Sequence, residues 1–179
     1  MSDIFLALSA LGSDKMGLVA TLTKYLAEHQ ANVEASHMAI LGGEFGMLML
    51  VSAPKASADK LQTDLPALAK QTGLHLELRV TKSPTEHRQS AMPYRLMADA
   101  ADNEGIIGRI TETCAAHGIN VVTLKSESYP APVTGAPLFR MNALLDVPQT
   151  VKISALREAL DSVAEANGID LELKADRRD

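Results

Sequence analysis

A short turn near the start of the chain, Gly12-Ser13-Asp14-Lys15-Met16-Gly17-Leu18-Val19, carries the residue types best suited to holding a small ligand. It follows an apolar run, 4–11, that predicts a strand, and it precedes a segment, 18–30, with the spacing of a helix. Asp14 can accept hydrogen bonds from free N–H groups of the first helical turn, and Gly17 allows a close approach to the backbone. Those N–H groups and the positive end of the helix dipole favour a small anion, such as a carboxylate.

The chain contains a second copy of this turn, Asp102-Asn103-Glu104-Gly105-Ile106-Ile107. A shift of 88 residues aligns the copies, pairing Asp14 with Asp102, Gly17 with Gly105, Thr23 with Thr111, Ala27 with Ala115, His29 with His117, Asn32 with Asn120 and Val33 with Val121. Later the shift becomes 94, which places six extra residues (94 minus 88) around 128–135, and near the end it is 95. The sequence therefore predicts an internal duplication.

Both copies predict the same order of elements: strand, helix, strand, strand, helix, strand. These elements are 4–11, 18–30, 32–41, 45–53, 57–72 and 74–80 in the first copy, and 94–101, 106–117, 119–126, 138–147, 153–167 and 169–174 in the second. Gly42-Gly43 indicates a tight hairpin turn. Pro66 predicts a kink or a break near Leu65, because proline inside a helix costs about 3 kcal/mol.

The fold class that follows is α+β, with two βαββαβ domains, each a four-stranded antiparallel sheet that carries both helices on one face. We expect a first domain at 1–82, a polar linker at 83–91 and a second domain at 92–179. The face of each sheet without helices needs a cover, which a second copy or a second chain could supply.

Composition excludes several classes of protein. The net charge of −5 and the three Phe and three Tyr argue against direct nucleic-acid binding, which needs basic and aromatic surfaces. No apolar stretch approaches the roughly 20 residues that cross a bilayer, and no cationic segment precedes the first apolar run. We therefore expect a cytoplasmic protein with no membrane partner.

No pattern for catalysis or metal binding stands out. The sequence lacks a Gly-x-Ser-x-Gly elbow, a phosphate-binding glycine loop and a His-Glu-x-x-His helix, so we expect no catalytic residues, no metal and no cofactor. His29 and His117 lie at predicted helix ends, where a partial positive charge is favourable. Cys114 takes the place of Leu26 on a buried helix face and is expected to be a packed, inert thiol.

Two βαββαβ units, each with an Asp-x-x-Gly-aliphatic-aliphatic turn and an Asn-aliphatic pair opening the second strand, resemble tandem ACT domains. The resemblance covers the whole chain. It implies a ferredoxin-like fold, amino-acid binding at domain interfaces and regulation without catalysis. In the family the ligand contacts come from the turn after the first strand and from the start of the second strand. The matching residues are Asp14, Lys15, Met16, Gly17, Leu18, Val19 and Asn32, and Asp102, Asn103, Glu104, Gly105, Ile106, Ile107 and Asn120.

The turns depart from the family in one respect, because many relatives have Arg-Pro before the glycine where this chain has Lys15-Met16 and Asn103-Glu104. An acidic side chain at Glu104 opposes a bound carboxylate, so the second copy binds either a different ligand or none. Two plainer interpretations stay open at this point. Asp14 and Asp102 can serve only as helix caps, and Asn32 and Asn120 can be turn residues in left-handed geometry.

Length and pairing most resemble a small two-domain regulator of glycine-cleavage transcription. This implies a protein that senses a small amino acid, with glycine as one candidate, and acts by contacting a transcription regulator or a metabolic enzyme. The alternative is a regulatory subunit or domain partner of an amino-acid or folate enzyme. Because ACT units tend to pair sheet edge to sheet edge, the resemblance also implies a homodimer.

Overall fold

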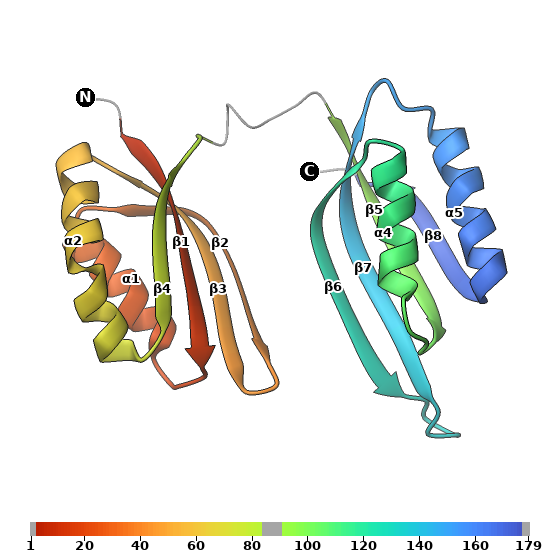
Figure 1. The fold of residues 1–179 in the computed structure, drawn as a ribbon, viewed down its shortest axis with the longest axis horizontal. Coiled ribbons are helices and arrows are strands. Elements are labelled where there is room, and N and C mark those ends of the chain that lie inside the picture. Colours follow the sequence, from red (N-terminus) through yellow and green to blue (C-terminus); the bar gives the residue numbers. More distant parts are fainter. Residues whose placement is uncertain (1–2, 84–90, 177–179) are drawn as a thin grey trace. The chain divides into compact units, whose positions relative to one another are not determined.

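The computed structural model describes residues 3–83 and 91–176, which form two compact units, Met1–His87 and Arg88–Asp179 (Figure 1). They are called unit 1 and unit 2 below, and each is described by itself. Most of the predicted linker, 83–91, lies outside the described residues. No helix among the described residues is long and apolar enough to cross a membrane.

Unit 1 is a four-stranded antiparallel sheet with both helices on one face, as Figure 1 shows. Its strand order is β2-β3-β1-β4. The elements in chain order are β1 Ile4–Ser13, α1 Leu18–Glu28, β2 Asn32–Leu41, β3 Glu44–Ala53, α2 Lys55–Thr72 and β4 His75–Thr81.

Unit 2 repeats this architecture with the strand order β6-β7-β5-β8. Its elements are β5 Ala91–Ala101, α4 Ile106–Ala116, β6 Asn120–Pro130, β7 Pro137–Pro148, α5 Ile153–Asn167 and β8 Ile169–Ala175. The predicted fold class is confirmed. The first strand of unit 2 begins three residues earlier than the predicted start at 94, and the strand that opens its hairpin runs four residues past the predicted end at 126.

Strand pairing confirms the duplication and its two insertions. Leu8 of β1 pairs with Met49 and Leu78, and Leu96 of β5 pairs with Ala143 and Leu173. The three offsets are 88, 94 and 95 (96 minus 8, 143 minus 49, 173 minus 78), the values that the sequence predicts. Most of the inserted residues lie in the β6–β7 hairpin, where unit 1 has the two-residue turn Gly42-Gly43.

Each unit has its own aliphatic core between the sheet and its helices. Alternate residues of the central strand, Leu6, Leu8 and Ala10, face the helices and are buried because side chains alternate between the two faces of a strand. Cys114 lies in the core of unit 2 and is 1% exposed, as predicted for a packed thiol.

Of the kink or break predicted near Leu65, the break is wrong, because α2 is one helix from Lys55 to Thr72 with Pro66 inside it. Proline removes the N–H that would bond the carbonyl of Gln62, four residues earlier. Both residues are exposed, so water can hydrate that carbonyl, while Leu65 and Leu68 stay buried on the other side of the helix. Burial of this apolar face outweighs the local cost.

Candidate ligand-binding turns

The first turn links the end of β1 to the start of α1 and is tied to the neighbouring hairpin. The N–H of Asp14 donates to the carbonyl of Gly43, 2.9 Å away, which fixes where the chain leaves the sheet. Gly17 then takes the N-cap position with φ of +87°, a left-handed geometry that favours glycine. The predicted capping by Asp14 is wrong, since no side chain of the described residues caps α1.

The second turn has the same construction. The N–H of Asp102 donates to the carbonyl of Pro137 at 3.0 Å, and Gly105 is the N-cap residue with φ of +83°. Within the described part of the chain no side chain caps α4, so capping by Asp102 is also wrong. Both helices therefore begin with backbone N–H groups that lack a side-chain partner, at the positive end of the helix dipole.

The space in front of the first turn is open. A Cβ atom built on Gly17 would meet no atom within 4 Å, so a ligand can reach the backbone there. Lys15 points away from this space, because its Nζ donates to the carbonyl of Thr72 at the end of α2, 3.3 Å away. The side chain of Leu18 is buried in the core, so this residue offers a ligand only its backbone. Met16 and Val19 expose their side chains.

The second turn carries a cation that the sequence analysis missed. A guanidinium N–H of Arg109 donates to the carbonyl of Glu104 at 2.9 Å. The same guanidinium lies 3.3 Å from the place that a Cβ of Gly105 would take, so it occupies space beside the turn. The available signal was a basic residue one helical turn after the glycine, where the first copy has Thr21.

Residues 5–79 match the family model of the ACT domain. The chain therefore contains an ACT domain in unit 1, and unit 2 repeats the same fold. It is 28% identical over 164 residues to the glycine cleavage system transcriptional repressor of Escherichia coli, covering 90% of this chain and 85% of that protein. The crystal structure of an unknown protein from Galdieria sulphuraria is similar with a TM-score of 0.84 and 31% identity, covering 97% of this chain and 99% of that one. A crystal structure of a proposed glycine cleavage system transcriptional repressor shows the same fold, with a TM-score of 0.73, 22% identity and coverage of 98% and 99%.

The two asparagines lie far from the turns within each ACT unit. Asn32 opens β2 and pairs with Ser52, whose partner on β1 is Phe5, whereas the turn begins after Ser13. Eight residues along β1 span about 26 Å at the usual rise of a strand. One unit alone therefore does not bring its own asparagine to its own turn.

The predicted left-handed geometry of these asparagines is wrong, because Gln30 and Gly118 adopt it instead, with φ of +55° and +69°. Asn32 instead donates to the Glu34 carboxylate from its side-chain amide at 3.0 Å. Ser52 donates a second hydrogen bond to the same oxygen. These two donors, the hydroxyl first, lower the pKa of Glu34.

His29 ends α1, as predicted, and also bridges to α2. One ring nitrogen lies 2.9 Å from the carbonyl of Tyr25, and the other lies 3.0 Å from a carboxylate oxygen of Asp64. The bond to Asp64 is the main cause of the raised pKa of His29. His117 keeps the backbone contact, to Thr113 at 2.9 Å, but has Ala159 where unit 1 has Asp64.

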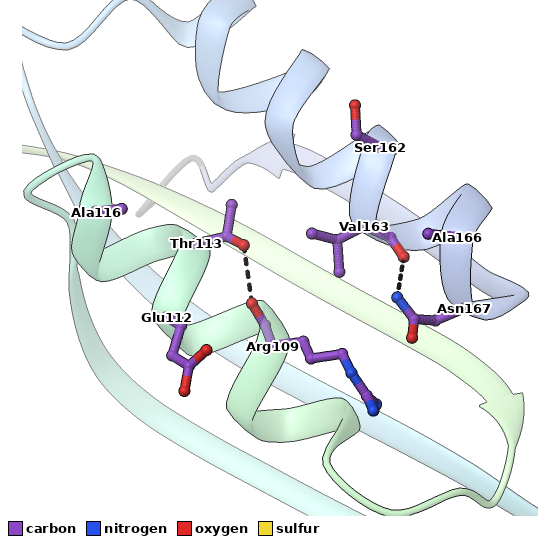
Figure 2. A pocket seen from close by; sticks show the side chains of 8 residues that line it. All are labelled: Arg109, Glu112, Thr113, Ala116, Ser162, Val163, Ala166 and Asn167. Atoms are coloured by element: carbon purple, nitrogen blue, oxygen red, sulfur yellow. Dashed lines mark hydrogen bonds between the residues drawn. The ribbon is translucent and has the colours of Figure 1, made fainter.

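A surface groove lies between α4 and α5 of unit 2 and shares Arg109 with the second turn (Figure 2). It is wide open to solvent, with a volume of about 480 Å³. Its lining residues are Arg109, Glu112, Thr113, Ala116, Ser162, Val163, Ala166 and Asn167. None of the predicted ligand residues lines it. The described residues also contain no cluster of His, Cys, Asp and Glu that could hold a metal ion.

Proposed function

We propose that the protein is a non-catalytic regulator in which the turns after β1 and β5 bind the carboxylate of a small amino acid. The observation that carries the proposal is the pair of glycine-capped helix starts, which present backbone N–H groups and no side-chain cap. Such groups, together with the helix dipole, bind small anions. A nearby carboxylate, Asp14 or Asp102, supplies the charge that suits the ligand's ammonium group.

The proposed contacts at the first turn are Asp14, Lys15, Met16, Gly17, Leu18 and Val19, and those at the second are Asp102, Asn103, Glu104, Gly105, Ile106 and Ile107. Asn32 and Asn120 join a site only from a neighbouring ACT unit, because each lies at the far end of its own sheet. The first turn is the more open one, which favours it as the primary site. Glycine is the candidate ligand, because the similar repressor of Escherichia coli is named for the glycine cleavage system.

The regulatory role is supported by similarity to the glycine cleavage system transcriptional repressor of Escherichia coli along 90% of the chain. We propose control of glycine-cleavage transcription in the cytoplasm, through contact with a transcription regulator rather than with DNA. A ligand drives such a switch by binding one conformational state more tightly than the other. The acidic composition agrees with a protein partner.

Calorimetric titration with glycine, alanine, serine and larger amino acids tests the binding. We expect heat on titration with glycine, and the other amino acids measure how far the site discriminates between side chains. Titration of full-length protein without heat or thermal shift at millimolar ligand contradicts the proposed site.

Gly17→Val places a branched side chain where the ligand must reach the backbone, and we expect at least about a tenfold loss of affinity. Gly118→Val is the matched control, because it also forces a valine into left-handed geometry with open space around it, but away from both turns. Circular dichroism checks that both variants fold. Unaltered binding by Gly17→Val places the site elsewhere.

A further inference from the structure

The two ACT units differ most on the face of the sheet that the helices leave bare, called the open face below. In unit 1 the two central strands put Phe5, Ala7, Ser9 and Leu11 from β1, and Gly46, Leu48, Leu50 and Ser52 from β3, on this face. Leu11 is 58% exposed and Leu48 is 54% exposed. An apolar surface of this kind, on the middle of a sheet, marks an interaction site.

The open face of unit 2 is charged at the same positions. Leu11 and Gly46 correspond to Asp99 and Arg140, which form an ion pair of 2.8 Å. The guanidinium of Arg140 also lies 5.1 Å from the ring centre of Tyr129. The charged groups of this row therefore have partners on the face itself and need no covering chain. Since the same fold carries both surfaces, the apolar face of unit 1 is not a requirement of the fold.

We infer that the open face of unit 1 pairs with the same face of a second copy of this chain, as two sheets packed face to face about a two-fold axis. Each row across β1 and β3 joins one large and one small side chain. The rows are Phe5 with Ser52, Leu50 with Ala7, Leu48 with Ser9 and Leu11 with Gly46.

A two-fold axis parallel to the strands, midway between β1 and β3, lays β3 over β1 of the second copy. Every large side chain then meets a small one. Leu48 lies over Ser9 of the second copy and Leu11 over its Gly46, with the sheets about 10 Å apart as in sandwiches. Such self-complementarity is what a two-fold interface requires.

The rim of the same face is complementary in hydrogen bonding, because an imidazole on one edge strand would meet a carboxylate on the other. His37 on the edge strand β2 lies in one row with Leu48, Ser9 and, on the opposite edge strand β4, Glu77. The proposed axis places β2 over β4 of the second copy, so His37 meets Glu77 at both rims. Glu77 also pairs with Arg79 on its own strand at 3.4 Å, and Arg79 then faces Ala35.

The charged open face of unit 2 is a poor cover for this surface, because burying its ion pairs against leucine would remove their hydration. The proposed contact also differs from edge-to-edge pairing, since it leaves the outer edges of β2 and β4 free. It does not depend on the proposed ligand.

Sedimentation of the full-length chain tests the inference, and we expect a dimer at micromolar concentration. Leu48→Asn introduces the residue that unit 2 carries at the same position, Asn142, so the fold should tolerate it. Two leucines are lost per dimer, and we expect the dissociation constant to rise roughly a hundredfold. Leu144→Asn on the open face of unit 2 is the matched control and should leave the dimer intact.

A charge exchange tests the orientation. His37→Glu opposes two carboxylates at each rim and should weaken the dimer, while adding Glu77→Arg to that variant should restore it. A monomeric wild-type chain overturns the inference, as does a dimer that survives Leu48→Asn. A dimer that both Leu48→Asn and Leu144→Asn disrupt places the contact on both units and overturns it too.

Discussion

At the scale of residues, the His29–Asp64 pair is present in unit 1 and has no counterpart in unit 2, although both units carry the histidine. The pattern of repeats predicts equivalent histidines, and both do end their helices. The partner of His29 lies 35 residues away on α2, and only the packing of the two helices brings it within 3.0 Å. A contact of this kind has no local signature in the chain.

This pair predicts a pH dependence of stability in unit 1. Because the pKa of His29 is raised above 6.5, its stabilisation is fully present below that pH and is lost as pH rises through the higher pKa of the folded state. We expect the melting temperature of the wild-type chain to fall by a few degrees more between about pH 6 and pH 8 than that of Asp64→Asn. Ala159, the equivalent residue in unit 2, shows that this position of the fold does not require the acid. Identical pH profiles would show that the pair contributes nothing.

The geometry of the two turns was the best predicted part of the candidate site, because glycine at a strand-to-helix turn has a local geometric cause. Two features escaped prediction for different reasons. Arg109 lies outside the turn motif and reaches back to it from the next helical turn. Asn32 was expected near the turn from the family resemblance alone, but its distance from the turn depends on strand order, which a linear motif does not contain.

At the scale of elements, Tyr25 joins the two helices of unit 1. Its hydroxyl donates to the carbonyl of Leu61 at 2.9 Å, and burial, assisted by Asp64, raises its pKa to about 12. Unit 2 has Thr113 at this position, where the surface groove opens. The tyrosine of unit 1 therefore spans the space between the two helices, whereas the smaller threonine of unit 2 leaves that space open as a groove.

Tyr25→Phe should lower the free energy of unfolding of unit 1 by about 1 kcal/mol, the usual net value of one hydrogen bond. Urea unfolding measures it. Tyr94→Phe in unit 2 is the control, since no hydrogen bond of that hydroxyl to a described residue is found and a much smaller change is expected. Equal effects of the two substitutions would argue that the loss is not due to the bond between the helices.

The hairpin of unit 2 offers a test of the duplication. Replacing residues 130–137 by Gly-Gly recreates the connection of unit 1, where Gly42-Gly43 joins strands of the same register. We expect a folded unit whose stability changes by no more than about 1 kcal/mol, because closing a shorter loop costs less entropy. Amide exchange across β6 and β7 reports the register. A loss of protection there would mean that the longer loop is needed for pairing.

Element order and the offsets between the two copies could be predicted because apolar periodicity, glycine turns and the repeat all indicate the same arrangement. The break at Pro66 was the main error at this scale. Propensity alone counts the missing hydrogen bond, whereas the folded unit gains the burial of Leu65 and Leu68 on the opposite side of α2. Tertiary packing decided the outcome.

At the scale of the whole molecule, one fold is used for two surfaces of opposite character. The cores of the ACT units match residue by residue, while the open faces differ in nearly every row. Sequence periodicity indicates which positions face the helices, but it carries no information about what contacts the other face. The pairing inferred for unit 1 came from comparing equivalent rows of the two sheets, which requires the register.

The buried thiol of Cys114 can report how often unit 2 opens. With 1% of its surface accessible and its pKa raised by burial, the thiol is shut off from dissolved reagents while unit 2 stays closed. Labelling speed in native buffer therefore measures how often that half of the chain opens. The chain has no other cysteine, so opening of the unit that contains α1 and α2 does not contribute to the labelling rate.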